Sequence, residues 1–355
     1  MTGNDPRPRT AGDVSSRRGR RRAARRRRRI AVVSAVVAVI LMSVAVIGGA
    51  WLVGVPSRDE GDVGRSVRVP ETARTDARER DVPEHDALSK GAVPAADAAL
   101  AGQRRLDALR GELERRISGY QGTWQMYLED LSSGASIAVN DHRGYSASVI
   151  KLYVMLAVYQ RISDGALAET DAIDELLRQM ITVSSNEATN ALIDTLGGGD
   201  ADAGFSVVND TAQRYGFTET YIHQYLGDLD GDPNQKQTSA VDSGRFMAAA
   251  YRGELVSPEY SRRMLDLLLG QTRRAKIPGG VPDGVMVANK TGEIPGVEND
   301  AAIVFATADT SAAIDGSATE GDYVLTVMTS DVADSAAAQA SIRDLSAAVW
   351  AVMEG

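Results

Sequence analysis

Ser148 and Lys151 stand three residues apart in a segment that is otherwise apolar. Lys151 is the only charged residue between Tyr145 and Tyr159, and burial lowers the pKa of an ammonium group toward the neutral amine. A neutral amine is a general base, and a serine three residues earlier on the same helical face is within its reach. The segment therefore predicts a serine nucleophile activated by a lysine. The structural alternative is that Ser148 caps a helix while Lys151 extends to the surface.

Lysine is rare in this chain: of the 39 basic residues only five are lysines, namely Lys90, Lys151, Lys236, Lys276 and Lys290. Where positive charge alone is needed the sequence uses arginine, so Lys151 is expected to serve as an amine that loses its proton. We expect a buried helix over residues 148–161, because this stretch is apolar on all sides. Free N–H groups and the helix dipole at its start would stabilise an oxyanion next to Ser148.

Two further polar clusters follow along the chain. They are Ser184-Ser185-Asn186, between two expected helices, and Lys290-Thr291-Gly292, which closes an expected strand. Taken singly, the first reads as helix capping and the second as a strand end with a turn glycine. In the order S-x-x-K, S-x-N and K-T-G, the three motifs resemble those of class A β-lactamases and penicillin-binding proteins. The resemblance also includes residues 180–192 and 271–304, and it covers the chain from about residue 100 to the end.

The resemblance implies a serine hydrolase that works through an acyl-enzyme and needs no cofactor. Ser148 would be acylated, and Lys151 would take part in its activation. Ser184 would relay a proton toward the leaving nitrogen. The backbone N–H groups of Ser148 and Glu293 would form the oxyanion hole.

The resemblance also implies how the substrate is held. Lys290 and Thr291, with Gly292 completing the motif, would bind the substrate carboxylate, and Asn186 would orient Lys151 and the substrate. The expected substrates are β-lactams or acyl-D-Ala-D-Ala-like amides of peptidoglycan. Two alternatives remain open: a peptidoglycan D,D-peptidase-like amidohydrolase, and a weakly catalytic module that binds the cell wall or β-lactams.

The sequence departs from the class A pattern where a glutamate should prepare the deacylating water. Residues 221–234 contain no Glu, and Asp230, with Asn234 four residues later, is the first candidate to replace it. Asp228 and Asp232 are the other candidates in this loop. A carboxylate that is one methylene shorter is displaced by more than about 1 Å, which can cost roughly 10²-fold in rate. Ser185 also replaces the family's Asp. We expect acylation to be intact and deacylation to be slow.

The order of the expected elements predicts the fold. Strands at 124–131 and 135–140 come first, helices dominate the middle, and strands at 285–290, 301–307 and 323–329 precede a closing helix at 335–352. This order predicts an α+β fold of the class A β-lactamase and transpeptidase type. Its antiparallel sheet would be assembled from both ends of the domain, with a helical lobe inserted.

The N-terminal part predicts a membrane anchor. Residues 1–29 carry twelve Arg and two Asp, and residues 30–55 carry no charge, long enough for a transmembrane helix. The arginines predict a cytoplasmic tail (1–29), a single-pass anchor (30–55), a disordered stalk (56–99) and an extracytoplasmic catalytic domain (100–355). The alternative is a cleaved signal peptide and a secreted protein.

Composition excludes several other classes of function. The chain has no Cys, and its three histidines, His85, His142 and His223, lack metal-ligand spacing, so we expect no metal site. The net charge is −9 despite the basic tail, so the remaining residues carry −19 and no nucleic-acid partner is expected. We expect a monomer.

Overall fold

A computed structural model of the chain describes residues 87–228, 235–306 and 319–354. All of them belong to one compact unit, Asp81–Gly355. The expected tail and anchor, residues 56–86 of the expected stalk, and Asp230, Asp232 and Asn234 lie outside the described residues. In the described ranges no helix is both long and apolar enough to cross a membrane, and no group of three or more acidic or histidine side chains could hold a metal ion.

The described residues form the following elements. The helices are α2 (Ala87–Ser118), η1 (Ala147–Ile150), α3 (Lys151–Ser163), α4 (Asp171–Thr182), α5 (Asn186–Leu196), α6 (Ala201–Arg214), α7 (Ala240–Tyr251), α8 (Pro258–Leu269), η3 (Ile277–Gly280) and α10 (Ser335–Met353), where η marks a 3-10 helix. The strands are β1 (Thr123–Asp130), β2 (Ser136–Val139), β3 (Gly144–Tyr145), β4 (Tyr221–Ile222), β5 (Lys236–Thr238), β6 (Met286–Ile294), β7 (Val297–Phe305) and β8 (Tyr323–Ser330).

The main sheet has the strand order β2-β1-β8-β7-β6, and every neighbouring pair is antiparallel. The first long strand, β1, pairs with the last, β8, over its full length, from Thr123↔Ser330 to Asp130↔Tyr323. The prediction that both ends of the domain build one antiparallel sheet is therefore confirmed. A second, small sheet has the order β3-β5-β4.

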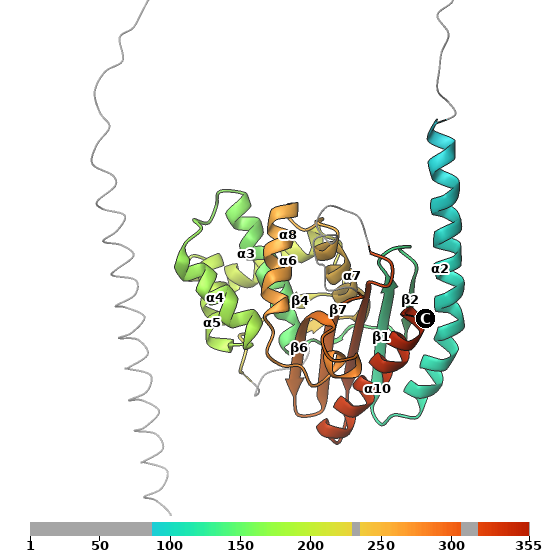
Figure 1. Cartoon of the computed structure of the whole chain (residues 1–355). Helices are drawn as coiled ribbons and strands as arrows, with labels where there is room; N and C mark the ends of the chain where they lie inside the picture. The colour runs from blue at the N-terminus through green and yellow to red at the C-terminus, as the bar shows by residue number, and fades with distance from the viewer. Residues whose placement is uncertain (1–86, 229–234, 307–318, 355) are drawn as a thin grey trace, which may run out of the picture. The chain divides into compact units, whose positions relative to one another are not determined.

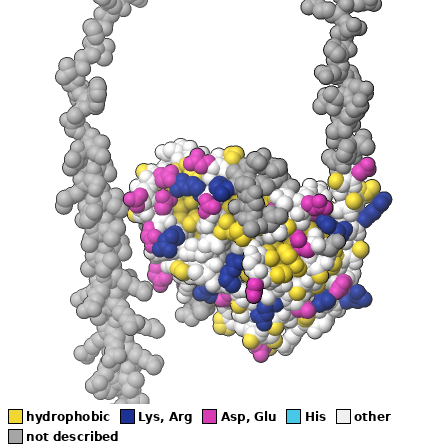
Figure 2. All heavy atoms as spheres, in the orientation of Figure 1, with side chains coloured by type: hydrophobic (Ala, Val, Ile, Leu, Met, Phe, Trp, Pro, Cys, Tyr) yellow, Lys and Arg dark blue, Asp and Glu magenta, His cyan; other side chains and the backbone are white. Residues whose placement is uncertain are grey.

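Two apolar cores lie on opposite faces of the main sheet, because alternate residues of a strand point to opposite faces. On β7, Ala302 and Val304 pack with α2 and α10, whereas Ala301 and Ile303 pack with α3 and the helical lobe. Figure 1 shows α10 and α2 covering one side of the sheet and the lobe with α3, α4 and α5 on the other. On the face shown in Figure 2, basic, acidic and apolar side chains are interspersed.

Local sequence explains where most of these helices begin. A side-chain oxygen at the N-cap accepts a backbone N–H bond at α4, α5, α6, α7, α8 and α10, and the capping residues are Thr170, Ser185, Asp200, Ser239, Ser257 and Asp334. Helix α2 begins at Ala87, before residue 100 where we placed the start of packed structure. Its buried residues Leu106, Leu109 and Leu113 follow the expected helical spacing.

Candidate active site

Ser148 lies in the 3-10 helix η1, directly before α3, so the prediction of one α-helix starting at Ser148 is wrong in its first turn. Side chains three residues apart eclipse each other in a 3-10 helix, which places Ser148 and Lys151 on one side of the chain. Ala147 has φ +46°, a left-handed conformation that costs a non-glycine residue roughly 1–3 kcal/mol. Ser148 is partly buried, and among the described residues its side chain has no hydrogen-bond partner.

Lys151 is fully buried and makes three hydrogen bonds, so the alternative in which it extends to the surface is wrong. Its Nζ donates to the Ser184 carbonyl (2.7 Å), the Ser184 Oγ (3.1 Å) and the Asn186 Oδ1 (2.8 Å). Burial lowers the pKa of Lys151 to about 7, and the nearby Arg273 acts in the same direction, while Glu187 opposes it. Near neutral pH the amine is therefore available as a base.

The residues of the Ser184-Ser185-Asn186 segment have two different roles. Ser185 caps a helix, whereas Ser184 and Asn186 contact Lys151. Ser185 is the N-cap of α5, and its Oγ accepts from the Ala188 N–H at 3.1 Å. The capping interpretation is thus correct for Ser185, and Ser and Asp serve equally well at this position. Ser184, with φ +59°, and Asn186 instead turn toward Lys151.

Lys290 approaches the same hydroxyl from strand β6. It is fully buried, and its Nζ donates to the Ser184 Oγ (3.0 Å) and the Thr291 carbonyl (2.8 Å), so Ser184 accepts hydrogen bonds from both lysines. Burial, followed by the charges of Lys151 and Arg273, lowers the pKa of Lys290 well below its usual range. No carboxylate of the described residues forms an ion pair with Lys290. Its position suits a bound anion.

Gly292 allows β6 to touch η1. A Cβ added at Gly292 would lie 2.7 Å from the Ser146 carbonyl oxygen and 3.0 Å from the Ser148 nitrogen. Because real Cβ atoms do not come this close to backbone, only glycine permits this approach. The predicted strand end at residue 290 is wrong, since β6 continues to Ile294 through its pairing with β7.

The register of β6 determines where the Glu293 N–H points. Glu298 faces Glu293 across the ladder, and its N–H and C=O both bond the Thr329 hydroxyl of β8, at 2.8 and 2.9 Å. In an antiparallel strand both backbone groups of a residue point to the same side, so Glu298 makes no ladder bond with Glu293. The Glu293 N–H therefore points to the open edge of β6. The Ser148 nitrogen lies next to β6, 3.0 Å from the Cβ position of Gly292.

The loop between β4 and β5 lies against the same site. Asn190 of α5 fixes it by donating to the Leu226 carbonyl (3.0 Å) and accepting from the Leu226 N–H (2.9 Å). Gly227 follows, and a Cβ there would lie 3.2 Å from the Asn186 Nδ2. Asp228 is exposed at the last described position of this loop segment, and Asp230 lies outside the described residues.

Family comparison agrees with this geometry. The Beta-lactamase enzyme family matches the chain over residues 108–174 and 172–353. The chain belongs to this family. The class A resemblance and the α+β fold drawn from the motifs are thereby confirmed. No curated protein matches the chain.

Solved structures of the family share its fold. PBP-A is 26% identical with a TM-score of 0.60, and the match covers 70% of this chain and 97% of PBP-A. A β-lactamase from Sphaerobacter thermophilus is 22% identical with a TM-score of 0.57, covering 73% and 96%. An ancestral class A β-lactamase is 21% identical with a TM-score of 0.58, covering 68% and 98%.

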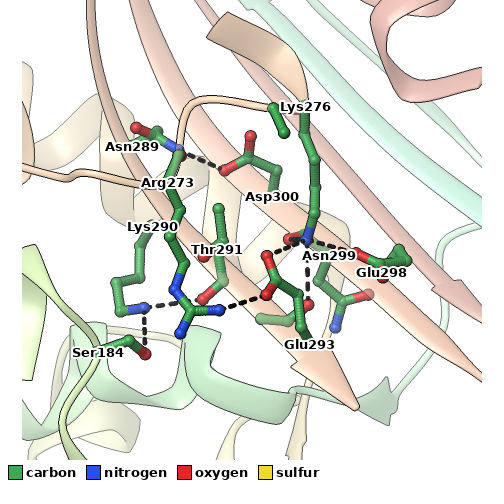
Figure 3. Close-up of polar contacts among 12 residues, drawn as sticks. Ser184, Arg273, Lys276, Asn289, Lys290, Thr291, Glu293, Glu298, Asn299 and Asp300 are labelled. Carbon is green, nitrogen blue, oxygen red and sulfur yellow. Dashed lines mark hydrogen bonds and ion pairs between the residues drawn. The ribbon is translucent and has the colours of Figure 1, made fainter. Parts of the chain in front are cut away.

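The structure adds side chains to which the sequence assigned no role. Arg273, before η3, forms an ion pair with the Glu293 carboxylate. The buried Lys276 contacts Glu293 at 3.1 Å and Glu298 at 2.8 Å. Figure 3 shows Glu293 between these two cations, with Lys290 and Ser184 nearby. Two features of the sequence pointed to Lys276: the scarcity of lysine, and its place in the segment 271–304 that resembles the family.

A fully buried acid lies beneath this group. Asp300 accepts from the Asn289 Nδ2 at 2.9 Å and from the Ile277 N–H at 3.1 Å. Burial raises the pKa of Asp300 to about 6, against the lowering effect of Lys276. These bonds fix η3 against β6 and β7 and so set the position of Lys276.

Proposed function

We propose that this protein is a serine hydrolase of the class A β-lactamase type, acylated at Ser148 by β-lactams or acyl-D-Ala-D-Ala-like amides. The observation that carries the proposal is the Lys151 amine, buried and with its pKa lowered to about 7, three residues after a hydroxyl that has no partner in the described part of the chain. Membership of the family supports hydrolase chemistry in general.

In the proposed acylation, Ser148, Lys151 and Ser184 act in turn. The Ser148 Oγ attacks the substrate carbonyl carbon, and its proton passes to neutral Lys151, whose lone pair is free when it donates only two hydrogen bonds. The C–N bond of the amide then breaks. Ser184 gives its proton to the departing nitrogen and regains one from the lysine, since its Oγ lies 3.1 Å from Lys151 Nζ. Water later hydrolyses the ester at Ser148 and restores the enzyme.

Other groups of the site are proposed to bind the substrate during this reaction. The negative charge that develops on the carbonyl oxygen is stabilised by the N–H groups of Ser148 and Glu293. Lys290 and Thr291 hold the substrate carboxylate, with Gly292 allowing the close approach. A penicillin-bound acyl-enzyme structure has been obtained for a PBP-A mutant whose sequence is 26% identical, which supports a penicillin as substrate or inhibitor here.

A peptidoglycan D,D-peptidase is the second candidate. The observation in its favour is the absence of Glu from residues 221–234, which removes the usual base for hydrolysis of a β-lactam acyl-enzyme. PBP-A, at 26%, is also more similar in sequence than the β-lactamases at 20–22%. A third candidate, a weakly catalytic binding module, lacks such an observation.

Covalent labelling tests the central claim. A fluorescent penicillin should label the purified domain, and Ser148→Ala should abolish the label while the thermal unfolding curve stays unchanged. Label that persists in Ser148→Ala would remove the proposal. Turnover of a chromogenic cephalosporin against release of D-Ala from an acyl-D-Ala-D-Ala peptide then separates the two enzyme candidates.

A further inference from the structure

Glu293 places a carboxylate beside the cations of the substrate-binding region. Its side chain is about one quarter exposed (27%), while that of Arg273 is about half exposed (48%) and that of Lys276 is buried (1%). Burial would raise the pKa of Glu293, but Lys276 and Arg273 lower it below its usual value, so the group is ionised at neutral pH. Figure 3 shows the carboxylate reaching both cations from the end of β6 that follows Gly292.

The cations of the site are unequally neutralised. Arg273 and Lys276 have Glu293 as an ion-pair partner, and Lys276 also has Glu298. In the described residues, Lys290 has no carboxylate in contact. Arg273 is nevertheless close enough to lower the pKa of Lys290 and of Lys151. Arg273 therefore lies near the region proposed to bind the substrate carboxylate, but its guanidinium is already paired with Glu293.

We propose that Glu293 determines the charge preference of this site by occupying Arg273, so that, among the described residues of the site, Lys290 is the one cation left to bind the substrate carboxylate, together with Thr291. The inference rests on the proposed function for the identity of the substrate. A planar guanidinium binds a carboxylate with two parallel hydrogen bonds, and Glu293 takes that capacity away from the substrate. Its own negative charge also repels an anionic substrate. The site therefore prefers an anionic substrate over a neutral one less strongly than it would if Arg273 were not paired with Glu293.

The test compares benzylpenicillin with its methyl ester, which lacks the negative charge. Glu293→Gln keeps the size of the side chain and the backbone N–H, but it removes the charge that holds Arg273. We expect the ratio of the two acylation rate constants, acid over ester, to rise about tenfold, a modest value because Arg273 is half exposed. Intact-protein mass spectrometry at a series of times measures both rates.

Two further variants distinguish the direct contact between Glu293 and Arg273 from a general electrostatic effect of a carboxylate near the site. Glu187→Gln removes an equal charge near Lys151, but Glu187 makes no ion pair with Arg273, so it should change both rates by the same factor. Arg273→Ala should change the ratio less than about threefold in the natural protein, and it should cancel the gain in Glu293→Gln. If Glu293 had only a structural role, the effects of Glu293→Gln and Arg273→Ala on the ratio would not depend on each other.

An unchanged or lower ratio in Glu293→Gln, with acylation intact, overturns this inference and leaves the proposed function standing. Absence of acylation by both compounds overturns the proposed function instead. In that case calorimetry with Ser148→Ala compares an acyl-D-Ala-D-Ala peptide with its C-terminal amide. The inference then requires that Glu293→Gln increase the preference for the acid, and equal binding of both peptides rejects it.

Discussion

At the scale of single residues, three buried lysines differ in the groups that they contact, and the proposed chemistry depends on this difference. Lys151, Lys276 and Lys290 are all at most 1% exposed, yet only Lys276 has carboxylate partners among the described residues. Lys276 is a structural cation. Lys151 and Lys290 bond instead to neutral oxygens, and burial lowers the pKa of each. Within the described part of the chain, Lys151 has no carboxylate partner to favour its ammonium form, so it can lose its proton, whereas a substrate carboxylate bound at Lys290 would favour the charged form there.

The first prediction is a pH profile for acylation. With the pKa of Lys151 at about 7, the neutral amine predominates above pH 7 and is lost as the pH falls below it. The rate of penicillin labelling should therefore rise with pH, reach half its maximum near pH 7, and fall about tenfold per unit at lower pH. Stopped-flow labelling between pH 5 and 9 measures it.

Lys151→Arg supplies the control for this profile. Arginine keeps the positive charge but does not lose its proton in this range, so labelling should be nearly abolished at every pH. A rate that is independent of pH in the natural protein, or strong labelling of Lys151→Arg, would mean that another group takes the Ser148 proton.

At the scale of elements, the site exists because an edge strand meets a 3-10 helix. Gly292 lets β6 lie against η1, and the ladder with β7 turns the Glu293 N–H to the open edge of the sheet. Neither element carries the site alone. A displacement of about 1 Å between them would cost roughly 10²-fold in rate, since the attacking and stabilising groups are on different elements.

A pair of glycine substitutions tests this contact. Gly292→Ala should cost about 1–3 kcal/mol of stability by overpacking and lower the labelling rate about 10²-fold. Gly111→Ala, in α2, is the matched control, because a Cβ there meets nothing within 4 Å. It should stabilise the protein by up to about 1 kcal/mol and leave labelling unchanged. Normal labelling of Gly292→Ala would show that the contact is not needed.

The third prediction concerns the loop between β4 and β5 and the rate of deacylation. Acylation has Lys151 and Ser184, whereas the deacylating water has no Glu in residues 221–234. Loss of general base catalysis slows a step by roughly 10²–10⁴-fold, so a chromogenic cephalosporin should give a burst near one equivalent and then slow turnover. Asp230→Asn should slow the second phase further, with Asp228→Asn as the comparison. Rapid linear turnover without a burst would show that another base serves.

At the scale of the whole molecule, the main sheet of the domain is complete only when its last strand is in place. Strand β8 lies between β1 and β7, and α10 covers the same face as α2. The site combines residues from η1, α5 and β6, and Lys290 of β6 lies more than a hundred positions after Ser148 and Asn186 in the sequence. One apolar face holds the site's scaffold of helices, and the other holds the two terminal helices.

The last prediction concerns the N-terminal segment. We propose that residues 30–55 anchor the chain in the cytoplasmic membrane with the catalytic domain outside, since arginines precede and acidic residues follow the uncharged stretch. Protease added to intact spheroplasts should remove the domain and leave a small membrane-bound fragment. A protected domain rejects the anchor, and a domain found only in the medium indicates signal cleavage.

The sequence by itself determined the family and the plan of the fold, and it predicted the chemistry. An isolated lysine in an apolar segment, a serine three residues earlier and two ordered motifs are local features, and so are the caps and periodicities that predict the helices. These signals sufficed for an antiparallel sheet drawn from both ends, and they predict the nucleophile and the base.

Only the tertiary structure decided how the groups meet. Pairing with β7 extends β6 past Lys290 to Ile294, a result that the glycine and polar residues of this stretch do not predict. The direction of the Glu293 N–H follows from that register, and the pairing of its side chain with Arg273 and Lys276 joins segments about twenty residues apart. Burial, which lowers the pKa of Lys151, is likewise a property of the assembled core, because it depends on what packs around the amine.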